Sequence, residues 1–187
     1  MHDFFLKAVY FYLIGFFLAI LEIQIEGQAG WAKNLPTWRP SAAKLWVRFL
    51  KTVSGQQEVT GYHLFLNIFL LLFLHWPFVW FGTWNIYAEL EMLALFVLFT
   101  VVWDFLWFVL NPKFSLRSFN RINVTWHKRW WGRVPTHYLV GVAVTAVLFL
   151  PEIINVNSSQ GSLKILILLA VNMCLTILTV ILYPKAY

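Results

Sequence analysis

Five apolar segments dominate this chain, and each is close to the length of a helix that crosses a bilayer. Such a helix needs about 20 consecutive, mostly apolar residues. A backbone surrounded by lipid has to satisfy its own hydrogen bonds, and a helix does so within one segment. The sequence therefore predicts an all-α, polytopic membrane helix bundle in one domain, 1–187. The predicted spans are 4–25, 61–81, 84–110, 137–154 and 163–183, and Pro151 is expected to kink or end the fourth.

The composition agrees with a membrane protein. Charged residues make up 12% of the chain, whereas a soluble domain usually carries about 25%, and the mean hydropathy is +0.70. The single cysteine, Cys174, excludes an intrachain disulfide and a cysteine-based zinc site. The net charge of +6 could suggest nucleic acid, but the placement of the cations indicates membrane orientation instead. We predict no nucleic-acid partner.

The basic residues are confined to alternate connecting segments. Five of the 14 Lys and Arg residues lie within 27–60 and six within 111–136, whereas segments 82–83 and 155–162 carry none. Segments rich in Lys and Arg remain in the cytoplasm. This pattern predicts a multi-pass protein of the cytoplasmic (inner) membrane, with its N-terminus outside and its C-terminus in the cytoplasm.

The first basic segment predicts an amphipathic helix over 41–53 that lies in the headgroup plane. Its cations recur at i, i+4 and i+7, and apolar residues occupy the opposite side. The second basic segment interleaves cations with tryptophans. Both segments are interpreted either as topology anchors or as a site for anionic lipid headgroups. The cations expected at the headgroups are Lys44, Arg48, Lys51, Lys128 and Arg129.

Ionisable side chains from four spans and one loop are predicted to meet at the cytoplasmic end. Glu22 and Glu26 are four residues apart, so a helix places them on one face. Asp104 lies about two turns inside the apolar boundary, where a charge needs a partner. His127, in the second basic loop, is expected to be a more mobile contributor. The candidate metal ligands are Glu22, Glu26, His63, Asp104, His127 and His137, and the candidates to orient them are Asn67 and Asn111.

Mixed carboxylate and imidazole ligands suit zinc, iron or manganese, and a helix bundle can hold two such metals. Without metal, Asp104, His63 and His137 are candidates for catalytic acid–base groups. The alternative is structural. Glu22 and Glu26 would then be solvated at a helix end, and the two histidines would be interfacial. Asp104 would make an interhelical salt bridge or hydrogen bond, for which an Arg or Lys from a basic loop is a candidate partner.

A second group of ionisable residues lies toward the outer side, at His75, Glu89 and Glu91. Glu91 precedes Asp104 by thirteen residues, or about 20 Å along a helix. The two groups are therefore predicted to be separate. The outer group is interpreted either as acid placement at a helix N-terminus, which the helix dipole favours, or as part of an ion path.

Three stretches carry a resemblance to other proteins. They are Glu-Ile-Gln-Ile-Glu-Gly at 22–27, Gly30-Trp31-Ala32 with Leu35-Pro36-Thr37-Trp38, and Asp-Phe-Leu-Trp-Phe-Val-Leu-Asn-Pro at 104–112. In these stretches, and over most of the first 140 residues, the chain resembles small uncharacterised polytopic membrane proteins of prokaryotes. The resemblance implies a prokaryotic inner membrane and implies no activity.

Two functions are consistent with these observations. The first is an enzyme with a polar, metal-binding site at the cytoplasmic interface that acts on a lipid or another amphiphile. The second is a non-enzymatic subunit of a larger membrane complex, a homo-oligomer or a small transporter. One variant of the second binds a pigment, or a haem between His63 and His137.

The predicted orientation can be tested with a reporter that is active only in the periplasm. Fused after Tyr187, it should give no signal, because the positively charged segments hold the C-terminus in the cytoplasm. Inserted in segment 155–162, it should be active. The reverse pattern would overturn the orientation.

Overall fold

The computed structural model describes residues 2–27, 30–155 and 158–183, and most of these residues are helical. The elements are α1 (His2–Glu26), α2 (Leu45–Ser54), α3 (Gly61–Leu74), α4 (Trp76–Phe81), α5 (Ile86–Leu110), the short 3-10 helix η1 (Leu116–Ser118), β1 (Trp130–Trp131), β2 (Val134–Pro135), α6 (Thr136–Asn155) and α7 (Ser158–Leu182). Among the described residues, five helical segments are long and apolar enough to cross a membrane, with α3 and α4 counted together as Gly61–Phe81. The predicted all-α bundle is confirmed.

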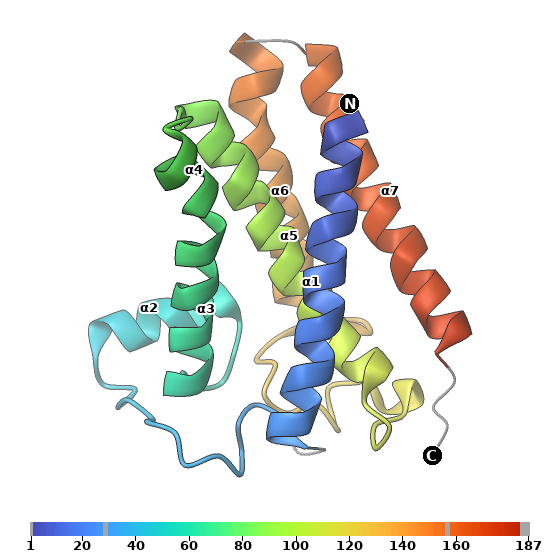
Figure 1. The fold of residues 1–187 in the computed structure, drawn as a ribbon. Coiled ribbons are helices and arrows are strands. Elements are labelled where there is room, and N and C mark those ends of the chain that lie inside the picture. The colour runs from blue at the N-terminus through green and yellow to red at the C-terminus, as the bar shows by residue number, and fades with distance from the viewer. Residues whose placement is uncertain (1, 28–29, 156–157, 184–187) are drawn as a thin grey trace.

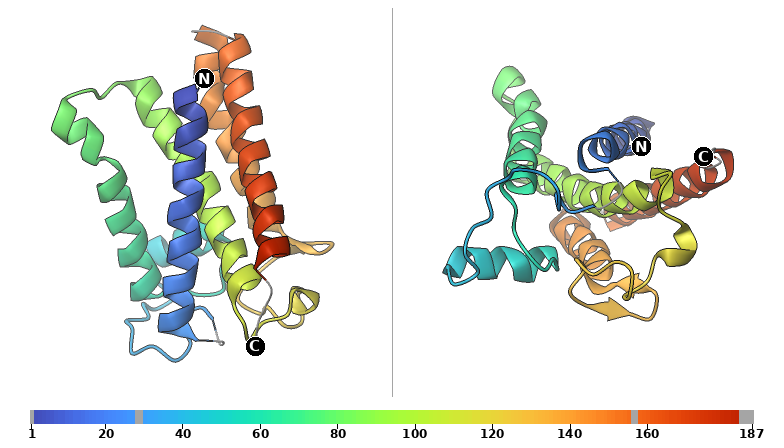
Figure 2. Two further views of the ribbon diagram at one scale, coloured as in Figure 1. Left: turned by 45° about the vertical axis from the view of Figure 1, so that its right-hand side comes forward. Right: turned by 90° about the horizontal axis from the view of Figure 1, so that it is seen from below.

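Helix α5 is the centre of the bundle. It packs against α1, α6 and α7, and it contributes more buried side chains than any other described helix. Figures 1 and 2 show α3 and α4 standing to one side of this group, with α2 crossing near the lower end of α3. The apolar side chains that α1, α3 and α7 expose face the surroundings of the bundle, as expected for helices in lipid.

Small residues allow α5 to approach its neighbours closely, which is how helices associate in membranes. A Cβ added at Gly141 of α6 would lie 2.5 Å from Cγ2 of Val101 on α5. A Cβ added at Gly15 of α1 would lie 3.4 Å from the ring of Phe99. The α5–α6 crossing is therefore the tighter of the two.

An ion-pair network connects four helices at the end of the bundle where α1 begins. Glu91 of α5 pairs with Lys7 of α1 and with Lys164 of α7, the latter at 2.6 Å. Lys164 also pairs with Glu152 of α6 at 2.8 Å. Charges inside a membrane protein are stabilised by such pairing. Glu91 thus joins the helices together.

The predicted outer group of His75, Glu89 and Glu91 does not form one cluster. His75 Nε2 lies 3.0 Å from Glu89 Oε1, and the Trp84 indole donates to the same carboxylate at 3.0 Å. Glu91 belongs to the separate network with the two lysines. We therefore find no continuous line of ionisable groups among the described residues that would support an ion path.

Helix boundaries differ from the prediction where backbone chemistry intervenes. The span 61–81 is interrupted at His75 because Pro77, near the start of α4, has no N–H to donate. Helix α5 begins at Ile86 instead of 84, because the Asn85 side chain accepts from the N–H groups of Tyr87 and Ala88. Helix α6 runs through Pro151 to Asn155, one residue beyond the predicted bound, so of the two expected effects Pro151 does not end the helix.

The amphipathic helix α2 begins at Leu45, four residues later than predicted. Ser41 instead closes a turn, in which its carbonyl accepts from the N–H of Lys44 at 3.1 Å. The helix ends at Gly55, which has a left-handed backbone with φ of +69°. The predicted amphipathic pattern holds along the helix, since Leu45, Phe49 and Val53 are exposed apolar residues beside the cations.

Replacing Gly141 with Ala should lower the melting temperature of the detergent-purified protein. The added Cβ meets the methyl of a β-branched side chain that has little rotamer freedom in a helix. Such overpacking costs about 1–3 kcal/mol. The additional substitution Val101→Ala removes the clashing methyl and should restore most of the loss. Equal stability of Gly141→Ala and the unmodified protein would contradict the close packing of α5 on α6.

Candidate functional site

A cavity of about 530 Å³ lies at the end of the bundle where α2 and the loops gather, and five helices line it. The helices are α1, α2, α3, α5 and α6. The lining is mostly apolar, but ionisable and other polar side chains collect at one end. They are Glu22, Glu26, Gln56, Glu58, Thr60, His63, Asp104 and His137.

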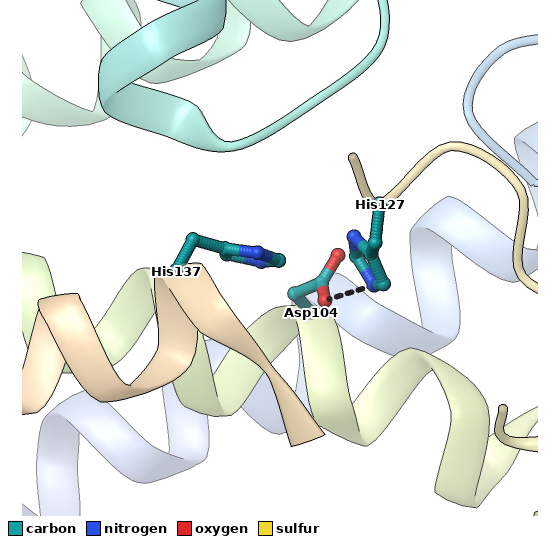
Figure 3. A group of neighbouring side chains, drawn as sticks. All are labelled: Asp104, His127 and His137. Carbon is teal, nitrogen blue, oxygen red and sulfur yellow. Dashed lines mark ion pairs between the residues drawn. The ribbon is translucent and has the colours of Figure 1, made fainter. Parts of the chain in front are cut away.

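One group of three side chains could hold a metal ion. Asp104 of α5, His127 of the loop before β1 and His137 of α6 each offer one ligand atom, and these atoms lie within 4.8 Å of one another. We call this group the Asp104 triad. His127 Nε2 is 3.3 Å from Asp104 Oδ2, and Figure 3 shows the His137 ring directed toward Asp104 from another side. Two imidazoles and a carboxylate form a donor set suited to zinc or iron.

Three imidazole nitrogens of the Asp104 triad are buried and make no hydrogen bond, although one of them lies 3.3 Å from the Asp104 carboxylate. They are both ring nitrogens of His137 and Nε2 of His127. Buried polar atoms are nearly always hydrogen-bonded, because losing water without a replacement is costly. The indole N–H groups of three tryptophans are also unpartnered, but an indole only donates and cannot bind a cation. An imidazole nitrogen can bind one.

His127 is held firmly by the end of α2. Its Nδ1 lies 3.2 Å from Gln56 Oε1, and the two residues pair across an isolated antiparallel bridge. With Nδ1–H donating to the amide oxygen, Nε2 presents its lone pair toward Asp104, which is the tautomer that binds metal. His127 is only 3% exposed. The contact with Gln56 connects the ring of His127, expected to be a more mobile contributor, to the segment that follows α2.

The end of α2 also abuts His137. A Cβ added at Gly55 would lie 2.6 Å from His137 Cβ, and Gly55 already requires a left-handed backbone. The carbonyl of Gly55 accepts from the N–H of Lys128, and the N–H of Gln57 donates to the carbonyl of Trp126. The segment 55–57 is thus connected to both histidines of the triad.

Asp104 has partners that differ from those expected. The Tyr138 hydroxyl donates to Oδ2, which also lies near His127. No ion pair between Asp104 and a Lys or Arg is present among the described residues. The interhelical hydrogen bond of the structural alternative is present, but its donor is the Tyr138 hydroxyl and not a Lys or Arg from a basic loop. The sequence placed Tyr138 next to His137 without indicating this contact.

A second group of three ionisable side chains lies on the other side of the cavity. The ligand atoms of Glu22, Glu26 and His63 fall within 4.8 Å of one another, and we call this group the Glu22 triad. His63 Nε2 is 3.3 Å from one oxygen of each carboxylate. Its Nδ1 is 2.6 Å from Thr60 Oγ1, and the ring stacks on Trp31 at 4.0 Å. Both His63 nitrogens are therefore engaged.

The six predicted ligands form two groups of three instead of one set. His127 and His137 lie beside α5, whereas His63 begins α3 and faces the last turns of α1. Both groups contribute to the same cavity. They also interact electrostatically, because the negative charge of Asp104 repels a negative charge on Glu22. The sequence indicated a common membrane level but could not indicate how the ligands divide around it.

The two asparagines have different environments. Asn67 lines the cavity, and its side chain donates to the carbonyl of His63 at 2.7 Å. Asn111 is fully buried at the end of α5, where it accepts from the N–H of Lys113 and donates to the carbonyl of Gly27. Asn111 thus fixes the end of α5 and the end of α1, and neither of these bonds reaches a candidate metal ligand.

The predicted headgroup cations lie at 44–51, in and just before α2, and at 128–129, in the loop before β1. A hydrogen bond from the N–H of Lys128 to the carbonyl of Gly55 connects these two segments. All are exposed except Lys51, which is half-buried. None of them lines the cavity as the structure describes it. The set comprises Lys44, Arg48, Lys51, Lys128 and Arg129.

Comparison with protein-family models, with curated proteins and with solved structures finds no match to this chain. What the chain does is therefore argued from the geometry of its own site.

Proposed function

We propose that this chain is a membrane-embedded metalloenzyme that acts on a lipid or another amphiphile at the cytoplasmic interface. Asp104, His127 and His137 would hold one divalent transition metal: zinc, iron or manganese. The observation that carries the proposal is the set of buried imidazole nitrogens without hydrogen-bond partners beside the half-buried carboxylate of Asp104. A bound cation would supply the partner that these nitrogens lack.

The residues around the Asp104 triad support this assignment. Gln56 fixes the ring of His127, and the Tyr138 hydroxyl fixes the carboxylate of Asp104. Groups that orient ligands in this way strengthen metal binding by roughly 10–100-fold. When bound, such a metal polarises an oxygen of the substrate or lowers the pKa of a coordinated water.

We assign proton handling to the Glu22 triad. His63 Nε2 lies between two buried carboxylates and can share a proton with either one. Thr60 and Trp31 hold the ring in place. His63 would therefore act as the acid–base group on the wall opposite His137. A second metal at this triad would have to displace the contacts that His63 already makes.

The haem variant of the alternative function is not favoured. A haem between His63 and His137 needs one free nitrogen on each ring. Both nitrogens of His63 have partners, in Thr60 and in the two carboxylates. No specific observation favours a complex subunit over an enzyme.

Metal content tests the proposal. Purified chain supplied with zinc, iron or manganese should retain roughly one equivalent of one of them, as expected for a single three-ligand site. His137→Ala and Asp104→Asn should each lose it. Asp104→Asn keeps an oxygen for the Tyr138 hydroxyl, so its melting temperature should stay near that of the unmodified protein. Gln56→Leu should weaken binding by about 10–100-fold.

His75→Ala is the matched control, because His75 is a histidine paired with a carboxylate that is not among the residues lining the cavity. It should retain the metal. Equal metal content in His137→Ala, Asp104→Asn and His75→Ala would show that the Asp104 triad does not bind the ion.

A further inference from the structure

The cavity extends beyond its polar end as an apolar arm between α3 and the pair α5 and α6. On each helix, an ionisable residue at the polar end is followed by cavity-lining residues at spacings of about one turn. Such spacings keep side chains on one helix face. On α5, Val101 and Val97 continue from Asp104. On α6, Val140 and Val144 continue from His137. On α3, Asn67 and Leu71 continue from His63.

The arm follows the helix axes away from the ionisable groups. Seven or eight helical residues separate the first and last member on each helix, which corresponds to about 10–12 Å. Because these helices are long enough to span a bilayer, the arm leads from the end near α2 toward the middle of the membrane. A lipid in the cytoplasmic leaflet has the same arrangement, with its polar end at the interface and its chain pointing inward.

The polar end does not suit a phosphate headgroup. Of the described residues that line the cavity, none is Lys or Arg, whereas Glu22, Glu26, Glu58 and Asp104 are carboxylates. An anionic phosphate would meet these like charges, and no Lys or Arg side chain lines the cavity to pair with it beside the proposed metal. The volume of about 530 Å³ falls in the range of pockets that enclose one drug-sized ligand. These features favour one hydrocarbon chain with a small, uncharged polar end.

We propose that the substrate is a single-chain amphiphile with an uncharged oxygen-bearing end, such as a long-chain alcohol or aldehyde. Its oxygen lies at the Asp104 triad, and its chain occupies the arm between α3, α5 and α6. This assignment of substrate class rests on the proposed function at that triad. The reacting carbon is then the one that carries the oxygen, because the far end of the chain lies among apolar residues.

Photolabelling of the metal-loaded chain in lipid nanodiscs tests this proposal. The probe is a long-chain alcohol with a diazirine in the middle of its chain. Labelled peptides should come from α3, α5 and α6 at the lining residues. Leu71→Trp fills the arm and should reduce this labelling about tenfold or more, as steric changes in apolar pockets do. Leu72→Trp is the matched control, because Leu72 is 70% exposed on the outer face of α3, and should label like the unmodified protein.

Three results would overturn the proposal. They are an absence of label in the arm, undiminished labelling of Leu71→Trp, and equal labelling of the arm by a phosphatidylcholine that carries the same diazirine. Metal content measured on the same samples separates this proposal from the proposed function. Labelled arm without bound metal supports the chain-binding arm and contradicts the metalloenzyme. Bound metal without label in the arm supports the metal site and contradicts the chain-binding arm.

Discussion

A carboxylate inside an apolar helix needs hydrogen-bonding or ionic partners. The partners of Asp104 on α5 determine how the segments that follow α5 pack against it. Its partners come from parts of the chain that follow α5: the Tyr138 hydroxyl on α6 and the His127 ring on the connecting loop. A charge within a membrane span is costly unless it is paired or hydrogen-bonded. Burying Asp104 therefore fixes the start of α6 and draws the basic loop inward. The same contacts bring two imidazoles beside one carboxylate.

The amphipathic helix α2 is joined to this centre through the two residues that follow it. Gly55 packs directly on His137, and Gln56 holds His127. Because α2 exposes apolar side chains beside its cations, it is suited to lie at the membrane surface. The residues that would orient the metal ligands thus belong to the segment that would contact lipid headgroups. This connection joins the candidate site to α2 through the chain itself and through hydrogen bonds.

Hydropathy was sufficient to predict the five spans, because the length of a span is set by the bilayer and not by tertiary contacts. The charge of Asp104 likewise predicted a partner, but not which one. Tyr138 and Gln56 reach the site only through packing between segments distant in sequence, and no local pattern marks them. His127 stands among tryptophans and cations that resemble a surface segment, yet it is buried because Gln56 pairs with it. The division of six ligands into two triads also depends on helix placement.

The central claim is that His127, His137 and Asp104 bind one metal ion together. X-ray absorption spectroscopy of the metal-loaded protein tests it most directly, because the signal reports the atoms bound to the ion. The account predicts scattering from two imidazole rings with nitrogen at about 2.0–2.1 Å, if the ion is zinc, together with oxygen ligands. One imidazole should disappear in any residual signal of His137→Ala. A spectrum with only oxygen ligands, unchanged by that substitution, would contradict the account.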